Sequence, residues 1–79
     1  MTCREAVLAA FERLERRHER REIDLSEVVG EVLAHTSQFA ESTIRTHITS
    51  RMCANATSHH ATVYADLKRV ARGCYRRRP

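Results

Sequence analysis

Two segments in the second half of this chain are rich in side chains that bind phosphates and nucleobases. In residues 42–51 serine, threonine and arginine predominate. Hydroxyl and guanidinium groups hydrogen-bond to phosphate oxygens and base edges, and small side chains let a helix lie deep in the major groove of DNA. The candidate contacts in this segment are Ser42, Thr43, Arg45, Thr46, Thr49, Ser50 and Arg51. The alternative interpretation is an ordinary solvent-exposed helix face.

The second segment, residues 68–78, is strongly basic. Its cations are Lys68, Arg69, Arg72, Arg76, Arg77 and Arg78, and we place DNA contacts at the first four. Such a cluster suits contact with phosphates or with the minor groove, although a basic tail that promotes solubility is the alternative. Between the two segments, Asn55, Ser58, His59 and His60 are candidates for contacts with the DNA backbone.

The charge of the chain is unevenly distributed. Residues 1–41 hold six Lys/Arg and nine Asp/Glu, for a net charge of −3. Residues 42–79 hold eight Lys/Arg and one acid, Asp66, for a net charge of +7. A domain polarised in this way offers one face to a polyanion, which favours a nucleic-acid partner.

Catalysis, metals and cofactors find little support in the residue pattern. Cys53 with His59 or His60, and Glu41 with His47, are the only catalytic pairs to consider, and neither comes with an oxyanion hole or a glycine-rich loop. The three widely spaced cysteines match neither a zinc site nor a disulfide framework. We therefore expect no enzyme activity, no metal and no cofactor. Because the N-terminus lacks a long apolar run, we expect a protein of the cytoplasm and nucleoid that does not enter membranes.

The elements that position these residues are predicted by periodicity and caps. Thr2 and Glu5 form a capping-box pattern before a first amphipathic helix. Ile23 is expected to form a short β-bridge, and Asp24 and Glu27 repeat the capping pattern before a second helix. The apolar stripe of this second helix consists of Leu25, Val28, Val29, Val32 and Leu33.

A third helix is predicted over residues 40–54, followed by a two-stranded hairpin. On a wheel of about 100° per residue, Ile44, Ile48 and Met52 share the core side with Arg51. The opposite side collects Ser42, Thr46, Thr49, Ser50 and Cys53. The hairpin turns at Arg72 and Gly73, with Val70 and Tyr75 facing the helices. The prediction is a mainly α fold with a small β-hairpin, a single winged helix-turn-helix domain over residues 1–79.

The stretch from about Asp24 to Arg78 resembles a small prokaryotic winged-helix family. The resemblance is carried by STIRTHITSRM, the NA…HH segment and DLKRVARGCYR. Its members occur alone and joined to restriction-type endonucleases, including some that act on modified DNA. The resemblance implies recognition of double-stranded DNA and suggests 5-methylcytosine in a CpG context. The chain carries no nuclease domain of its own, so it would only read the mark.

An arginine can pack against the methyl group of 5-methylcytosine while it hydrogen-bonds the O6 and N7 atoms of the neighbouring guanine. The wheel favours Arg45 in this role, with Arg51 as the second candidate, and Thr46 and Thr49 could add methyl contacts.

Three alternatives remain open at this point: a sequence-specific transcriptional regulator, a winged helix that docks another protein, and an RNA-binding domain. RNA binding is the weakest of them, because the two Tyr and two Phe suit the core better than stacking platforms. The residue pattern allows either a monomer or a homodimer on DNA.

Overall fold

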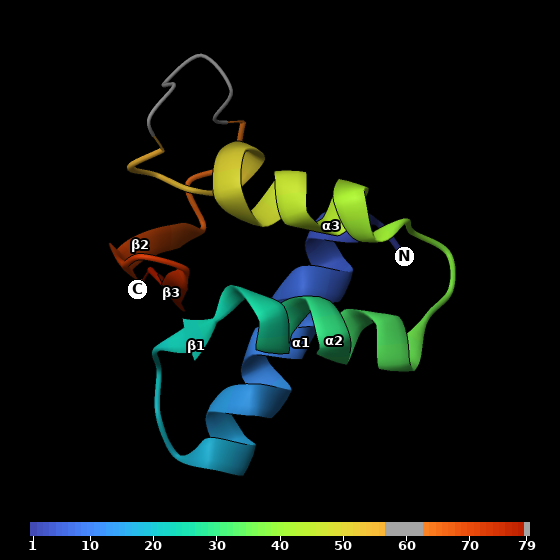
Figure 1. Cartoon of the computed structure of the whole chain (residues 1–79), viewed down its shortest axis with the longest axis horizontal. Helices are drawn as coiled ribbons and strands as arrows, with labels where there is room; N and C mark the ends of the chain where they lie inside the picture. The colour runs from blue at the N-terminus through green and yellow to red at the C-terminus, as the bar shows by residue number, and fades with distance from the viewer. Residues whose placement is uncertain (57–62, 79) are drawn as a thin grey trace.

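The structure, a computed structural model, describes residues 1–56 and 63–78. Within them the elements are α1 (Cys3–His18), β1 (Ile23–Asp24), α2 (Leu25–His35), α3 (Glu41–Thr46), the π-helical segment η1 (His47–Arg51), β2 (Leu67–Ala71) and β3 (Cys74–Arg77). α1 and α2 cross each other below α3, and the sheet lies beside the C-terminal end of the α3–η1 unit (Figure 1). The described part of the chain thus combines three helices with a three-stranded antiparallel sheet.

The first helix forms as its sequence predicts. The Thr2 hydroxyl accepts from the Glu5 N–H, and the Glu5 carboxylate accepts from the Thr2 N–H, so the capping box is confirmed. Val7, Phe11 and four further residues form the buried stripe of this helix. The helix ends where Glu19 adopts the left-handed conformation, with φ at 52°.

The second helix follows its apolar stripe with one exception. Val28, Val29 and Val32 are buried, whereas Leu33, the last residue of the predicted apolar stripe, is exposed. Leu33 stands beside Val32 at the edge of the stripe, and no described element covers that edge. Asp24 occupies the N-cap position without a side-chain hydrogen bond, so the second capping pattern sets only the boundary of the helix.

The third helix departs from a regular α-helix halfway along. It is α-helical only to Thr46 and continues as the π-helix η1, closed by the Met52 N–H donating to the His47 carbonyl at 2.8 Å. A π-helix has more residues per turn, so each residue advances by less than the roughly 100° of an α-helix. The side chains after His47 therefore lie on other sides than a regular wheel places them.

Three strands form the sheet in the order β1-β3-β2. Ile23 pairs with Tyr75, which confirms the predicted bridge, and the β2–β3 hairpin turns at Gly73, whose φ is +70°. The register shifts between Arg69 and Ala71, so Val70 lies in a bulge and is only partly buried. The chain just after η1 lies along β2 at the edge of the sheet, because the Met52 carbonyl accepts from the Leu67 N–H at 2.8 Å.

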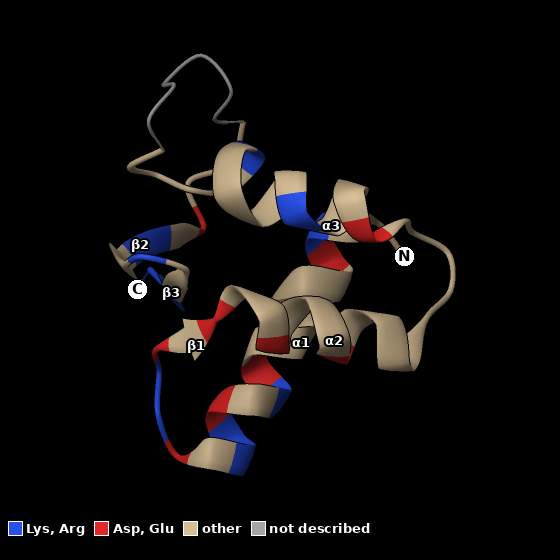
Figure 2. Cartoon of the chain, in the orientation of Figure 1, with Lys and Arg blue, Asp and Glu red and all other residues tan. Residues whose placement is uncertain are grey.

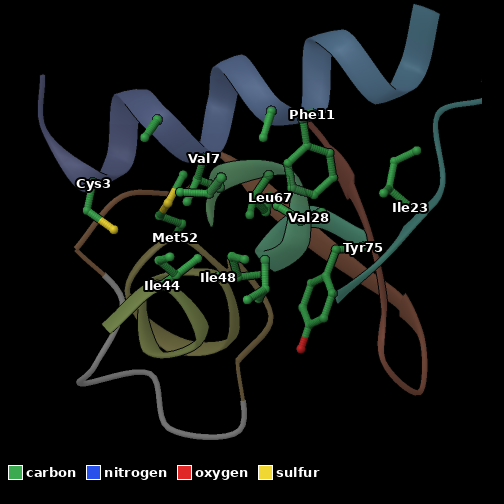
Figure 3. Close-up of a cluster of buried hydrophobic side chains, with 14 of the residues drawn as sticks. Cys3, Val7, Phe11, Ile23, Val28, Ile44, Ile48, Met52, Leu67 and Tyr75 are labelled. Carbon is green, nitrogen blue, oxygen red and sulfur yellow. The ribbon is translucent and has the colours of Figure 1, made fainter. Parts of the chain in front are cut away.

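The core lies between α1, α2, the α3–η1 unit and the inner face of the sheet (Figure 3). Phe11, Val28, Ile48, Leu67 and Tyr75 contribute from these four parts. Cys53 is also buried, with 1% of its surface exposed, which corrects its predicted place on the outward face of the third helix. The chain has left the helix at this point, because η1 ends at Arg51 and Cys53 forms a bridge with Leu67 of β2.

Candidate nucleic-acid interface

The hydroxyl-rich segment lies on the outer side of the α3–η1 unit. Ser42, Thr43, Arg45 and Thr46 are exposed, and Thr49 and Ser50 are half-buried. Ile44 and Ile48 hold the opposite side in the core, so these polar residues face away from it. The structure thus brings the predicted contacts of α3 onto one continuous surface.

Two threonines of this surface use their hydroxyl groups within the helix. Thr46 donates to the carbonyl of Ser42 at 2.9 Å, and Thr49 donates to the carbonyl of Arg45 at 2.8 Å. A hydroxyl that donates to the backbone keeps its lone pairs as acceptors, and the γ-methyl group remains available for apolar contact. The surface therefore offers methyl groups and acceptors more than donors.

Arg45 and Arg51 differ in their surroundings. The Arg45 Nε lies 3.4 Å from a Glu41 carboxylate oxygen one turn earlier, and both side chains are exposed. A regular wheel places Arg51 on the core side, as a snorkelling stem or a phosphate contact from the helix end, and in the structure its side chain is exposed. No described carboxylate lies within ion-pair distance of Arg51.

Arg51 lines a groove along the α3–η1 unit, here called the α3 groove, of about 430 Å³. Its walls consist of Ser42, Thr43, Thr46, His47 and Arg51 on one side and Val63 and Tyr64 on the other. The second wall is fixed to the first, because the N–H groups of Val63 and Tyr64 both donate to the Arg51 carbonyl at 2.8 Å. Helical periodicity gave no signal for these two residues, because this wall exists only in the folded chain.

The Tyr64 wall is also anchored to α1. The Arg4 guanidinium lies over the Tyr64 ring, 4.3 Å from its centre, and hydrogen-bonds both Asp66 carboxylate oxygens at 2.8 Å. These hydrogen bonds raise the pKa of Arg4 above its usual value. The pair also neutralises Asp66, which is the one acid of residues 42–79.

The hairpin presents a second cluster of cations. Lys68 and Arg76 are directly opposite each other in the β2–β3 ladder, and like charges in that position destabilise a sheet. Arg69 and Arg72 are exposed nearby, and no described carboxylate lies within ion-pair distance of any of the four. Arg77 differs, because it forms a two-pronged ion pair with Glu15 of α1 at 2.6 and 2.8 Å.

Asn55, one of the predicted DNA contacts, already forms hydrogen bonds within the protein. Asn55 is exposed, but its side-chain oxygen accepts from the Arg69 N–H at 2.9 Å and its amide donates to the Arg69 carbonyl at 3.0 Å. Asn55 therefore connects the end of η1 to the hairpin. Ser58, His59 and His60 lie outside the described residues.

Basic and acidic residues lie close together along α1 (Figure 2), and most of the remaining cations of the acidic half are paired within that half. Arg13, Arg16, Arg17 and Arg20 each pair with a glutamate of α1 or α2, which leaves Arg21 without an ion pair in the described part of this half. The cations without a carboxylate partner gather in the second half instead, on η1 and the hairpin.

The thiols offer little nucleophilic chemistry. Burial raises the pKa of the Cys3 and Cys74 thiols above the usual value, so both stay protonated near neutral pH. Within residues 1–56 and 63–78, no three His, Cys, Asp or Glu side chains come together in a group that could hold a metal ion. In the same residues, no helix combines the length and the apolar character needed to cross a membrane.

These features define a small domain of three helices and an antiparallel sheet with a cationic, hydroxyl-rich face. The chain belongs to the family described as a domain of unknown function, DUF7669, which it matches over residues 2–77. No curated protein and no solved structure matched the chain.

Proposed function

We propose that this protein is a winged-helix module that binds double-stranded DNA, with the α3–η1 unit in the major groove and the β2–β3 hairpin as the wing. The observation that carries the proposal is the group of cations without carboxylate partners on η1 and the hairpin. The element order supports it, because helix, strand, two helices and a hairpin, with the sheet order β1-β3-β2, suit this architecture.

The β2–β3 hairpin and the α3–η1 unit differ in chemistry, which suggests that they have different roles in binding. The hairpin presents mainly charge, since Lys68, Arg69, Arg72 and Arg76 can neutralise phosphates, and phosphate contacts carry no sequence information directly. The α3–η1 unit presents small side chains that fit a groove about 12 Å wide. We therefore assign affinity mainly to the hairpin and sequence reading mainly to the helix.

A preference for 5-methylcytosine in CpG is the finer part of this proposal. It is supported by Thr46 and Thr49, whose hydroxyl protons are used in the helix and whose methyl groups remain for apolar contact. A methyl group in the major groove is recognised by such contacts, as thymine is. The side chains on this surface are thus suited to a methylated base edge.

The test is a titration of three duplexes of one sequence, in which a central CpG is unmethylated, methylated on one strand or methylated on both. Fluorescence anisotropy at several salt concentrations gives the affinity and its salt slope. Each phosphate neutralised contributes about −0.9 to the slope of log K against log salt. We expect tightest binding to the fully methylated duplex and a slope that becomes shallower by about one in Lys68→Gln and in Arg76→Gln.

Arg16→Gln is the matched control, because Arg16 is an exposed cation of α1 paired with Glu12 at 3.6 Å. Its slope should equal that of the unchanged protein. Equal binding to all three duplexes would remove the methylation part and leave a DNA-binding domain with another target, such as an operator of a regulator. No salt-sensitive binding to any duplex would refute DNA binding and favour a protein partner for the hydroxyl-rich face.

A further inference from the structure

We infer that the α3 groove is a reading site for the major-groove edge of one C·G base pair, with Arg51 as its specificity-determining residue in place of Arg45. This inference rests on the proposed function and names the residues that perform it. The groove combines a guanidinium, an imidazole and an aromatic wall within about 430 Å³. Each of these three groups matches one chemical feature of a C·G pair.

Arg51 provides the donors for guanine. Guanine presents two acceptors, O6 and N7, in the major groove, and the guanidinium fork binds both at once. Arg51 lines the groove and has no carboxylate partner among the described residues, so binding a base breaks no ion pair. Arg45 must first leave Glu41, and it does not line the groove.

His47 provides an acceptor for cytosine. Its Nδ1 lies 3.0 Å from the Thr43 carbonyl, and a carbonyl can only accept, so Nδ1 carries the proton. In the neutral ring Nε2 then holds a lone pair. Cytosine presents the N4 amino group as a donor in the major groove, whereas thymine presents an acceptor at the corresponding position. The tautomer fixed by Thr43 therefore favours cytosine over thymine.

Val63 and Tyr64 provide an apolar wall for the substituent at C5 of the cytosine. They are 58% and 40% exposed, so part of their apolar surface faces water in the free protein. Tyr64 is held in place by Arg4 on its ring and by its N–H on the Arg51 carbonyl. A wall that is already ordered loses little conformational entropy when a methyl group packs against it.

The test compares Arg51→Lys with Arg45→Lys, because lysine keeps the charge and loses the two-pronged geometry. Binding is measured on the methylated duplex and on one in which the C·G pair is replaced by T·A. A two-pronged contact worth about 1–3 kcal/mol corresponds to roughly 5–150-fold discrimination. We expect this ratio in the unchanged protein and in Arg45→Lys, and a clearly lower ratio in Arg51→Lys, where the preference supplied by His47 remains, with little loss of overall affinity.

The wall is tested by Tyr64→Ala with Tyr64→Phe as its control. Tyr64→Ala should lower the ratio of methylated to unmethylated binding, and Tyr64→Phe should keep it, because phenylalanine preserves the wall. Thermal unfolding of each variant identifies those that fail to fold, and those are replaced by Tyr64→Leu or Arg51→Gln.

The outcomes separate this inference from the proposed function. Salt-sensitive DNA binding with discrimination that persists in Arg51→Lys, or that is lost in Arg45→Lys instead, overturns the inference and leaves DNA binding in place. Equal loss of affinity for all duplexes in Arg51→Gln would show a phosphate contact and would also overturn it. No DNA binding by the unchanged protein refutes the proposed function and the inference with it.

Discussion

Replacing Glu31 by glutamine should destabilise the domain at neutral pH and much less in acid. Glu31 is 7% exposed on α2, where it accepts from Arg13 Nε at 2.8 Å and from Arg17 at 3.0 and 3.3 Å. The His35 Nε2 also lies 3.0 Å from it. The hydrogen bonds from the two arginines, of which that from Arg13 has the largest effect, lower the pKa of Glu31 from 4.5 to about 2.

The pH range of the effect follows from this shift. Because the folded pKa lies below the unfolded one, the stabilisation is fully present above about pH 4.5 and is lost as the pH falls toward 2. A shift from 4.5 to about 2, at roughly 1.4 kcal/mol per pH unit, corresponds to about 3 kcal/mol. Folding of small domains is worth about 5–15 kcal/mol in total, so the loss should be easy to measure.

The measurement is urea unfolding followed by circular dichroism for the unchanged protein and Glu31→Gln between pH 7 and pH 2.5. The difference in the free energy of unfolding should be about 2–3 kcal/mol at pH 7 and should shrink with falling pH. Glu12→Gln is the control, because Glu12 is 57% exposed and pairs only with Arg16; it should cost under about 0.5 kcal/mol. A deficit of Glu31→Gln that stays constant with pH would attribute its effect to packing and refute the electrostatic reasoning.

Three further predictions concern the hairpin. Gly73→Ala should cost about 1–2 kcal/mol of unfolding free energy by thermal or urea unfolding, because φ is +70° there; an unchanged stability would contradict the assigned turn. Asn55→Ala should speed hydrogen exchange at the Arg69 amide and cost about 1 kcal/mol, since two backbone hydrogen bonds are lost. Arg77→Ala and Glu15→Ala should show a coupling free energy of about 0.5–1 kcal/mol in a double-mutant cycle, and additive losses would argue against the ion pair.

Much of the fold could be predicted because the signals are local. The capping box of Thr2 and Glu5, the valine stripe of α2 and the turn at Gly73 each depend on a few neighbouring residues. Ile23 was recognised as a bridge because it is one apolar residue among charged ones. These features need no information on how distant parts of the chain meet.

The details of the site could not be predicted in the same way. The helix ends in a π-helical turn at Arg51, and Cys53 is buried beside Leu67, and a regular wheel anticipates neither feature. Tyr64 enters the site because its N–H and that of its neighbour bond to the Arg51 carbonyl, a contact formed only in the folded chain. Glu31 carries no signal in the local sequence, because the arginines that pair with it are supplied by α1.

Two long-range ion pairs connect the acidic half of the sequence to the basic half. Arg4 neutralises Asp66, and Glu15 binds Arg77, so each half of the chain supplies the partner for one residue of the other. The first pair neutralises Asp66, which follows the Tyr64 wall of the α3 groove by two residues, and the second neutralises Arg77 on the hairpin. Among the described residues of the second half, the cations without a carboxylate partner are Arg51 in the groove, Lys68, Arg69, Arg72 and Arg76 on the hairpin, and Arg78 after it. In the DNA-binding role proposed above, the charged hairpin would hold any phosphate backbone, and discrimination between sequences would come from the groove, where one guanidinium stands among hydroxyl, imidazole and aromatic groups.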